Sequence, residues 1–173
     1  MTPEFSRPVR IDTLGEGGRT LTVEADPAER AALARRFELI SLEALSADAA
    51  LRREADSIFV EGRIRASVEQ ACVATGAAVP AAIDEPFSLR FVPAGQAAGE
   101  EIELDAEDVD TIDYEGGAID LGEAVAETLA LSLDPFPRAA DADAVLREAG
   151  VLSEDEVVAG PFAALQALKD KLG

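Results

Sequence analysis

Apolar and polar residues alternate along two neighbouring stretches of the chain. In residues 57–73, SIFVEGRIRASVEQACV, Val60 and Ile64 share one side, and most charged residues occupy the other. The pattern returns in residues 82–92, AIDEPFSLRFV, where Phe87 lies on the apolar side. A period of two indicates strands, and a short connection of small residues joins these two. We therefore expect an antiparallel pair with one face toward the core and one face in water.

Residues 118–137, AIDLGEAVAETLALSLDPFP, have a helical period instead. One apolar residue recurs every four positions, at Leu121, Val125, Leu129 and Leu133. Asp120 precedes this stripe and Glu123 follows three residues later, which predicts a capping box at the start of an amphipathic helix. Pro135 ends the helix, because it lacks an N–H group and disfavours a helical residue before it.

The N-terminal third contains three further elements. PVRIDTL and RTLTVEA flank a GEGG turn at residues 15–18 and together indicate a hairpin. Residues 26–39, DPAERAALARRFEL, indicate a helix capped by Asp26, with Pro27 at its first position. ELISLEALSADAAL is a weaker strand candidate, since its alternation is partial and rich in alanine.

An acidic run follows the second clear strand. Residues 100–115 contain nine Asp and Glu and no Lys or Arg, and interspersed apolar residues indicate short strands. An EF-hand loop needs oxygen ligands at its first, third and fifth positions. A loop starting at Asp108 places Ile112 at the fifth, so the calcium pattern fails. A solvated acidic strand and loop is favoured, with weak divalent binding as the alternative.

These elements predict an α+β fold. We expect a mainly antiparallel β-sheet, either open or curled into a barrel-like form, packed by a few short helices. Residues 1–137 are expected to form a single domain. Residues 138–173 are expected to form a loosely held C-terminal tail with a short terminal helix in GPFAALQALKDKLG.

Composition argues against an enzyme. The chain has no His, which removes the usual general base and the commonest metal ligand, and it has no glycine-rich phosphate loop. Its single cysteine, Cys72, is expected to be a buried and inert thiol. We predict no catalytic residue, no cofactor and no metal site. No apolar run is long enough to span a membrane, and a cytoplasmic location is expected.

Charge indicates two candidate interaction surfaces. Thirty-five acidic and fifteen basic residues give a net charge of −20, and eleven of the thirteen arginines lie within residues 1–93. The polar face of the strand pair would carry Arg63, Arg65 and Arg90, a candidate RNA contact. Their alternative role is cross-strand pairing with the acids of the same face, Glu61, Glu69 and Asp84. The candidate surface for a basic partner comprises Glu101, Glu103, Asp105, Asp108, Asp110, Asp113, Glu123 and Glu127.

Four stretches together resemble the bacterial YceD-type proteins, named for large ribosomal RNA subunit accumulation. They are the strand pair from VEGRIRASVEQACV to SLRFVP, the acidic approach to the helix DLGEAVAETLALSLDPFP, the C-terminal GPFAALQALK, and, more weakly, the N-terminal strand, turn and helix. Many members have paired cysteines at the turn, where this chain has Cys72 and Thr75. A structural zinc needs about four ligands, so any metal role of relatives does not transfer.

The resemblance implies a non-enzymatic cytoplasmic factor that supports 23S rRNA accumulation and assembly of the large ribosomal subunit. Its partners would be large-subunit rRNA or a pre-ribosomal particle. The alternative is an acidic adaptor or holdase that binds a basic ribosomal protein or an assembly factor without contacting RNA.

Overall fold

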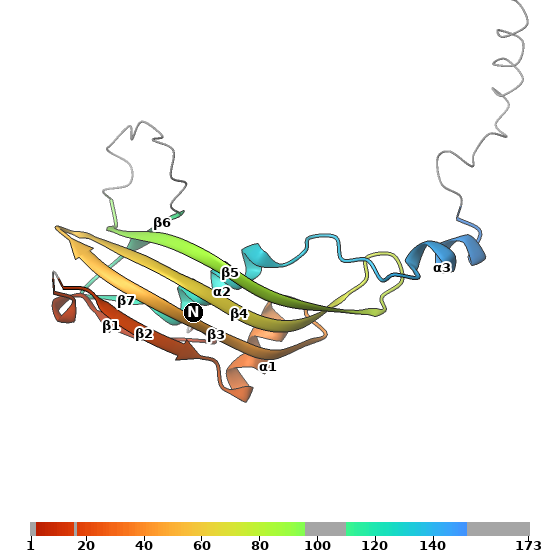
Figure 1. Cartoon of the computed structure of the whole chain (residues 1–173), viewed down its shortest axis with the longest axis horizontal. Coiled ribbons are helices and arrows are strands. Elements are labelled where there is room, and N and C mark those ends of the chain that lie inside the picture. Colours follow the sequence, from red (N-terminus) through yellow and green to blue (C-terminus); the bar gives the residue numbers. More distant parts are fainter. Residues whose placement is uncertain (1–2, 16, 96–109, 152–173) are drawn as a thin grey trace, which may run out of the picture.

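The computed structural model describes residues 3–15, 17–95 and 110–151, which form two sheets and several short helices (Figure 1). The larger sheet has the spatial order β2 (Arg19–Glu24), β3 (Ser41–Glu54), β4 (Ser57–Ala71), β5 (Ala78–Pro93) and β6 (Asp110–Tyr114). The smaller sheet pairs β1 (Pro8–Arg10) with β7 (Ala118–Asp120). The helices are η1 (Ile11–Thr13, a 3-10 turn), α1 (Pro27–Arg36), α2 (Leu121–Ser132) and α3 (Ala142–Glu148).

The predicted α+β class is confirmed. Strands β2 to β5 are antiparallel to their neighbours, and β6 runs parallel to β5 at the edge. The described strands form an open, curved sheet and not a closed barrel (Figure 1).

The strand pair β4–β5 forms as predicted, with Arg63 opposite Pro86 and Ile64 opposite Glu85. The inward residues Val60 and Ile64 are fully buried. The weak candidate is also a strand, β3, and it is 14 residues long. Its alternation is partial in the sequence because small residues such as Ala47 and Ala49 take core positions that larger apolar residues usually fill.

The predicted N-terminal hairpin is wrong. Strand β1 pairs with β7, Val9 opposite Ile119, whereas β2 pairs with β3. The chain still turns at the glycines, where the Gly18 N–H donates to the Gly15 carbonyl at 3.2 Å. β1 does not pair with β2 because the 3-10 turn η1 redirects the chain before it reaches the glycines. The pairing of β1 with β7 instead buries both Val9 and Ile119.

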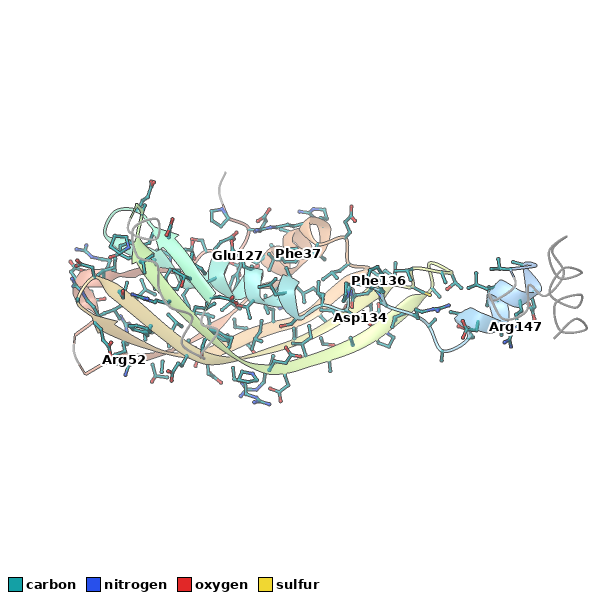
Figure 2. All side chains as sticks on the ribbon, turned by 90° about the horizontal axis from the view of Figure 1, so that it is seen from above. Phe37, Arg52, Glu127, Asp134, Phe136 and Arg147 are labelled. Atoms are coloured by element: carbon teal, nitrogen blue, oxygen red, sulfur yellow. The ribbon has the colours of Figure 1, made fainter. Side chains whose placement is uncertain are left out.

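Helices α1 and α2 lie on one side of the large sheet, and the other side carries no helix among the described residues (Figure 2). Leu121, Val125 and Leu129 of α2 are fully buried, and Leu133 packs partly against the core. The amphipathic helix is therefore confirmed, and it ends shortly before Pro135. We call the uncovered side of the large sheet the open face.

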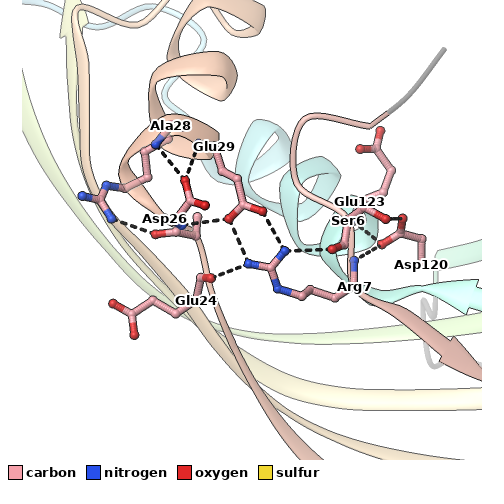
Figure 3. A network of polar contacts seen from close by, with 10 residues as sticks. Ser6, Arg7, Glu24, Asp26, Ala28, Glu29, Asp120 and Glu123 are labelled. Carbon is pink, nitrogen blue, oxygen red and sulfur yellow. Dashed lines mark hydrogen bonds and ion pairs between the residues drawn. The ribbon is translucent and has the colours of Figure 1, made fainter.

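Polar contacts join the N-terminal segment to both helices (Figure 3). Arg7 donates two hydrogen bonds to the Glu29 carboxylate, at 2.7 and 2.9 Å, and its backbone N–H donates to Asp120 at 2.7 Å. Ser6 donates to the other oxygen of Asp120. Because Asp120 also accepts from the Glu123 N–H at 3.2 Å, one carboxylate caps α2 and holds the chain before β1.

The two helix starts differ in their capping. At α1, Asp26 and Glu29 form the full reciprocal capping box. At α2, only the Asp120 half of the predicted box forms. The Glu123 carboxylate turns to Arg36 at the end of α1, with nitrogen–oxygen distances of 2.8 and 3.0 Å. An ion pair between helices therefore replaces the predicted local bond.

After α2, residues 134–139 run along the end of the sheet, and we call this segment the strap. Gln70 Nε2 donates to the Asp134 carbonyl at 2.8 Å, and the Val73 N–H donates to the Pro137 carbonyl at 2.9 Å. Helix α3 follows beyond the end of the sheet (Figure 1). The predicted terminal helix lies outside the described residues, and the domain boundary at residue 137 stays a prediction.

Candidate functional site

Arg63 and Arg65 lie on the open face and are paired with carboxylates. Arg63 Nε is 2.5 Å from Asp84 Oδ1, and Arg65 Nη1 is 2.8 Å from Asp48 Oδ2. Arg65 also lies 3.7 Å from Asp84. These guanidinium groups lower the pKa of Asp84 and Asp48 through hydrogen bonds to the charged carboxylates. Cross-strand pairing thus occurs, with Asp84 and Asp48 as the acids.

Arg90 lies on the same face but apart from the other two arginines. It stands opposite Phe59, four residues along β5 from the Pro86 that faces Arg63. At about 3.4 Å per residue, this separates the two backbone positions by roughly 14 Å. The Arg90 guanidinium donates to Ser57 Oγ at 3.2 and 3.4 Å. The structure therefore does not bring the three predicted arginines into one cluster.

A second group of side chains surrounds Phe59. Arg52 of β3 and Arg90 of β5 stand directly opposite Phe59 of β4, one on each side. Their guanidinium carbons lie 5.4 and 5.7 Å from the centroid of the Phe59 ring. We call these three residues the Arg–Phe–Arg row. Arg52 and Phe59 were not predicted as site residues, although an inward Val60 implies an outward Phe59.

Three shallow hollows with arginine in their lining lie near the β3–β4 turn. One of about 260 Å³ lies beside Arg52 and Phe59. Two other hollows, of about 560 and 550 Å³, are lined in part by Arg53. The Arg53 side chain donates a hydrogen bond to the carbonyl of Ala55. Glu54 lines one of them and Asp12 another, so each combines a cation with a carboxylate.

The predicted acidic surface is only partly described. Asp110 and Asp113 are exposed on the edge strand β6. Glu127 is exposed on α2, on the helical side of the sheet and away from Arg52 (Figure 2). Glu123 is occupied by Arg36. The remaining four predicted acids, Glu101, Glu103, Asp105 and Asp108, lie outside the described residues.

Cys72 is buried, as predicted, but its chemistry differs from the expectation. The Ala139 N–H points at Sγ from 3.3 Å, and this bond together with the Thr75 hydroxyl lowers the pKa of the thiol to about 7. The strap thus supplies the main donor that stabilises the thiolate. Only 3 % of the Cys72 surface is exposed, which limits access to the sulfur.

Neither a cluster of metal ligands nor a membrane-spanning helix occurs among the described residues. No three Cys, Asp or Glu side chains are grouped there so that they could hold a metal ion. In the same residues, no helix is both long and apolar enough to cross a membrane.

Comparison with known proteins identifies a matching family. The family model described as "Large ribosomal RNA subunit accumulation protein YceD" matches residues 60–169. The matched region starts in β4, includes the β5 strand that carries Arg90, and contains α2 and α3. Curated proteins and solved structures gave no match. Since the family model covers more than half of the sequence, the chain belongs to the YceD family of large ribosomal RNA subunit accumulation proteins.

Proposed function

We propose that this protein is a non-enzymatic, cytoplasmic factor of ribosome biogenesis that supports accumulation of 23S rRNA and assembly of the large subunit. The observation that carries the proposal is the family match over residues 60–169. It includes the pair β4–β5 and the capped helix α2, which are central elements of the fold.

The open face supports a role as a binding protein. It carries exposed charged residues on adjacent long strands, including Arg63, Arg65 and Asp84. With a net charge of −20, the molecule as a whole repels a phosphate backbone. Contact with rRNA therefore has to be local, and we expect it to be sensitive to salt.

The acidic composition favours a second candidate, an adaptor or holdase that binds a basic ribosomal protein or an assembly factor. Asp110 and Asp113 expose their carboxylates on an edge strand, and Glu127 exposes another on α2. A negatively charged surface attracts basic proteins and speeds their association. In this case the protein reaches the pre-ribosomal particle through its partner and not through RNA.

Affinity purification from growing cells at low salt tests the proposal, with co-purifying RNA and proteins identified together. Enrichment of large-subunit RNA and immature particles is expected. If contact is direct, an Arg90→Glu chain loses RNA but folds normally. If the adaptor role holds, amide replacements at Asp110, Asp113 and Glu127 lose a basic protein instead. Recovery of neither RNA nor ribosomal proteins contradicts both functions.

A further inference from the structure

Phe59 occupies an unusual position for an aromatic side chain. Its neighbours Ile58 and Val60 are fully buried, so the alternation of β4 turns Phe59 toward the open face. No other aromatic residue stands on that face among the residues described. Phe5, Phe87 and Phe91 are buried in the core, and Phe37 and Tyr114 pack partly against it. Phe136 is exposed but lies on the strap (Figure 2). The ring of Phe59 is partly exposed.

Two guanidinium groups flank this ring at fixed positions. Arg52 and Arg90 are its direct cross-strand neighbours, with their guanidinium carbons 5.4 and 5.7 Å from the ring centroid. Ser57 Oγ accepts from Arg90 at 3.2 Å and helps to orient it. Since all three residues lie on paired strands, the spacing of cation, ring and cation is set by the sheet.

The charges of this row are available to an anion. In the described part of the chain Arg90 has no carboxylate partner. Arg52 pairs with Glu54 at 3.2 Å, which is longer than the ion pairs of Arg63 and Arg65, although all three pairs are similarly exposed to solvent. Arg63 and Arg65 differ, because they are held by Asp84 and Asp48 at 2.5 and 2.8 Å.

A hollow of about 260 Å³ lies beside the ring and is lined in part by Phe59 and Arg52. Gly17 and Gly18 line one part of it and contribute no side chains. Thr20 and Glu61 also line it and offer a hydroxyl and a carboxylate. Groups of this kind can hydrogen-bond the amino and imino edges of an unpaired base.

We propose that the Arg–Phe–Arg row is a stacking platform for unpaired RNA bases, with Arg52 and Arg90 contacting the adjoining phosphates. Bases stack on aromatic rings and on guanidinium planes, and phosphates attract guanidinium groups. The inference rests on the proposed function and names unpaired RNA as what the protein contacts. Arg52 and Phe59 precede residue 60, where the family match begins, so the platform is argued from this chain's own geometry.

The test uses the full chain and a short, fluorescently labelled, unpaired RNA, with fluorescence anisotropy at low salt and then at rising salt. Phe59→Leu keeps an apolar side chain on the strand but removes the aromatic face. Arg90→Gln removes the cation that has no carboxylate partner among the described residues. Each is expected to weaken binding by about fivefold or more, because Phe59→Leu removes base stacking and Arg90→Gln removes a phosphate contact. Arg63→Gln is the matched control on the same face and is expected to change affinity by less than about twofold.

Circular dichroism and thermal unfolding of each variant establish that it folds. Absence of binding at low salt overturns the platform, and so does unchanged binding by Phe59→Leu. If only Arg63→Gln loses binding, the platform is overturned, and the RNA contact lies near Arg63 and Arg65 instead. Binding of a duplex in preference to the unpaired strand contradicts stacking.

Complementation separates this inference from the proposed function. In cells depleted of the protein, a chain carrying both Phe59→Leu and Arg90→Gln is expected to restore 23S rRNA poorly. Full restoration by that chain overturns the platform and leaves the ribosomal role intact. Depletion without any effect on 23S rRNA contradicts the proposed function itself.

Discussion

Glu123 binds Arg36 across two helices, with Arg36 Nη2 2.8 Å from Glu123 Oε1. Arg36 also lies 3.0 Å from the Glu4 carboxylate. The end of α1, the start of α2 and the N-terminal segment therefore meet at one guanidinium group. A residue that local sequence assigns to a helix cap is used instead to join distant parts of the chain.

Glu123→Gln is expected to lower the free energy of unfolding by about 1 kcal/mol, because it removes a partly buried, two-fold hydrogen-bonded ion pair. Urea denaturation at neutral pH measures the change. Glu127→Gln is the control, since Glu127 is exposed one turn further along α2. Equal effects of the two substitutions would contradict a structural role for the Arg36 pair.

The Arg7–Glu29 pair predicts a loss of stability in acid. The hydrogen bonds from Arg7 lower the pKa of Glu29 below its ordinary value of 4.5. The unfolded chain therefore takes up a proton at higher pH than the folded chain does. This contribution to the free energy of unfolding is present above pH 4.5 and is lost as the pH falls through the folded pKa.

Glu29→Gln is expected to reduce stability at neutral pH and to flatten the stability profile below pH 4.5. Arg7→Gln should flatten the profile in the same way, since Glu29 loses its partner. The profiles come from denaturant titrations across the acidic range. A variant curve that runs parallel to the wild-type curve throughout that range would show that the pair contributes no such dependence.

Gly62 is required by the packing of β4 between β3 and β5. A Cβ atom at this position would lie 2.5 Å from the Asp48 carbonyl oxygen and 2.6 Å from Cζ of Phe87. Gly62→Ala is therefore expected to cost about 1–3 kcal/mol, as overpacked cores do. Gly117→Ala is the control, because no atom lies within 4 Å of its added Cβ. Thermal unfolding of both chains makes the comparison, and an unaffected Gly62→Ala chain would refute the close contact.

Cys72 is expected to titrate near pH 7 in the folded protein and near its ordinary value of 9.0 in denaturant. The donors at Ala139 and Thr75 cause the difference, so Thr75→Val should raise the pKa of the folded thiol. The pH dependence of slow alkylation, read by mass spectrometry, gives both values. A folded midpoint close to 9.0 would show that the strap does not donate to the sulfur.

Elements with strong local signals could be predicted from the sequence. The pair β4–β5 buries one face along most of its length, so its period of two is visible in the residues. Helix α1 has a capping box, Asp26 with Glu29, that forms within one turn. Helix α2 shows its stripe because Leu121, Val125 and Leu129 all reach the core.

The errors come from contacts between distant residues. A glycine turn marks a reversal but does not choose the partner strand, and Val9 pairs with Ile119 far along the chain. Alternation places Arg90 on the open face, but only the register of β4 against β5 puts it opposite Phe59 and away from Arg63. The Arg–Phe–Arg row depends on two such registers, which no local pattern encodes.

The most direct test of the ribosomal role is the ratio of 23S to 16S rRNA in cells depleted of this protein, measured together with sucrose-gradient profiles. A factor that supports large-subunit accumulation predicts a fall in 23S rRNA relative to 16S rRNA, with immature large-subunit particles, and recovery when the wild-type chain is supplied. An unchanged ratio and a normal gradient profile after full depletion would contradict it.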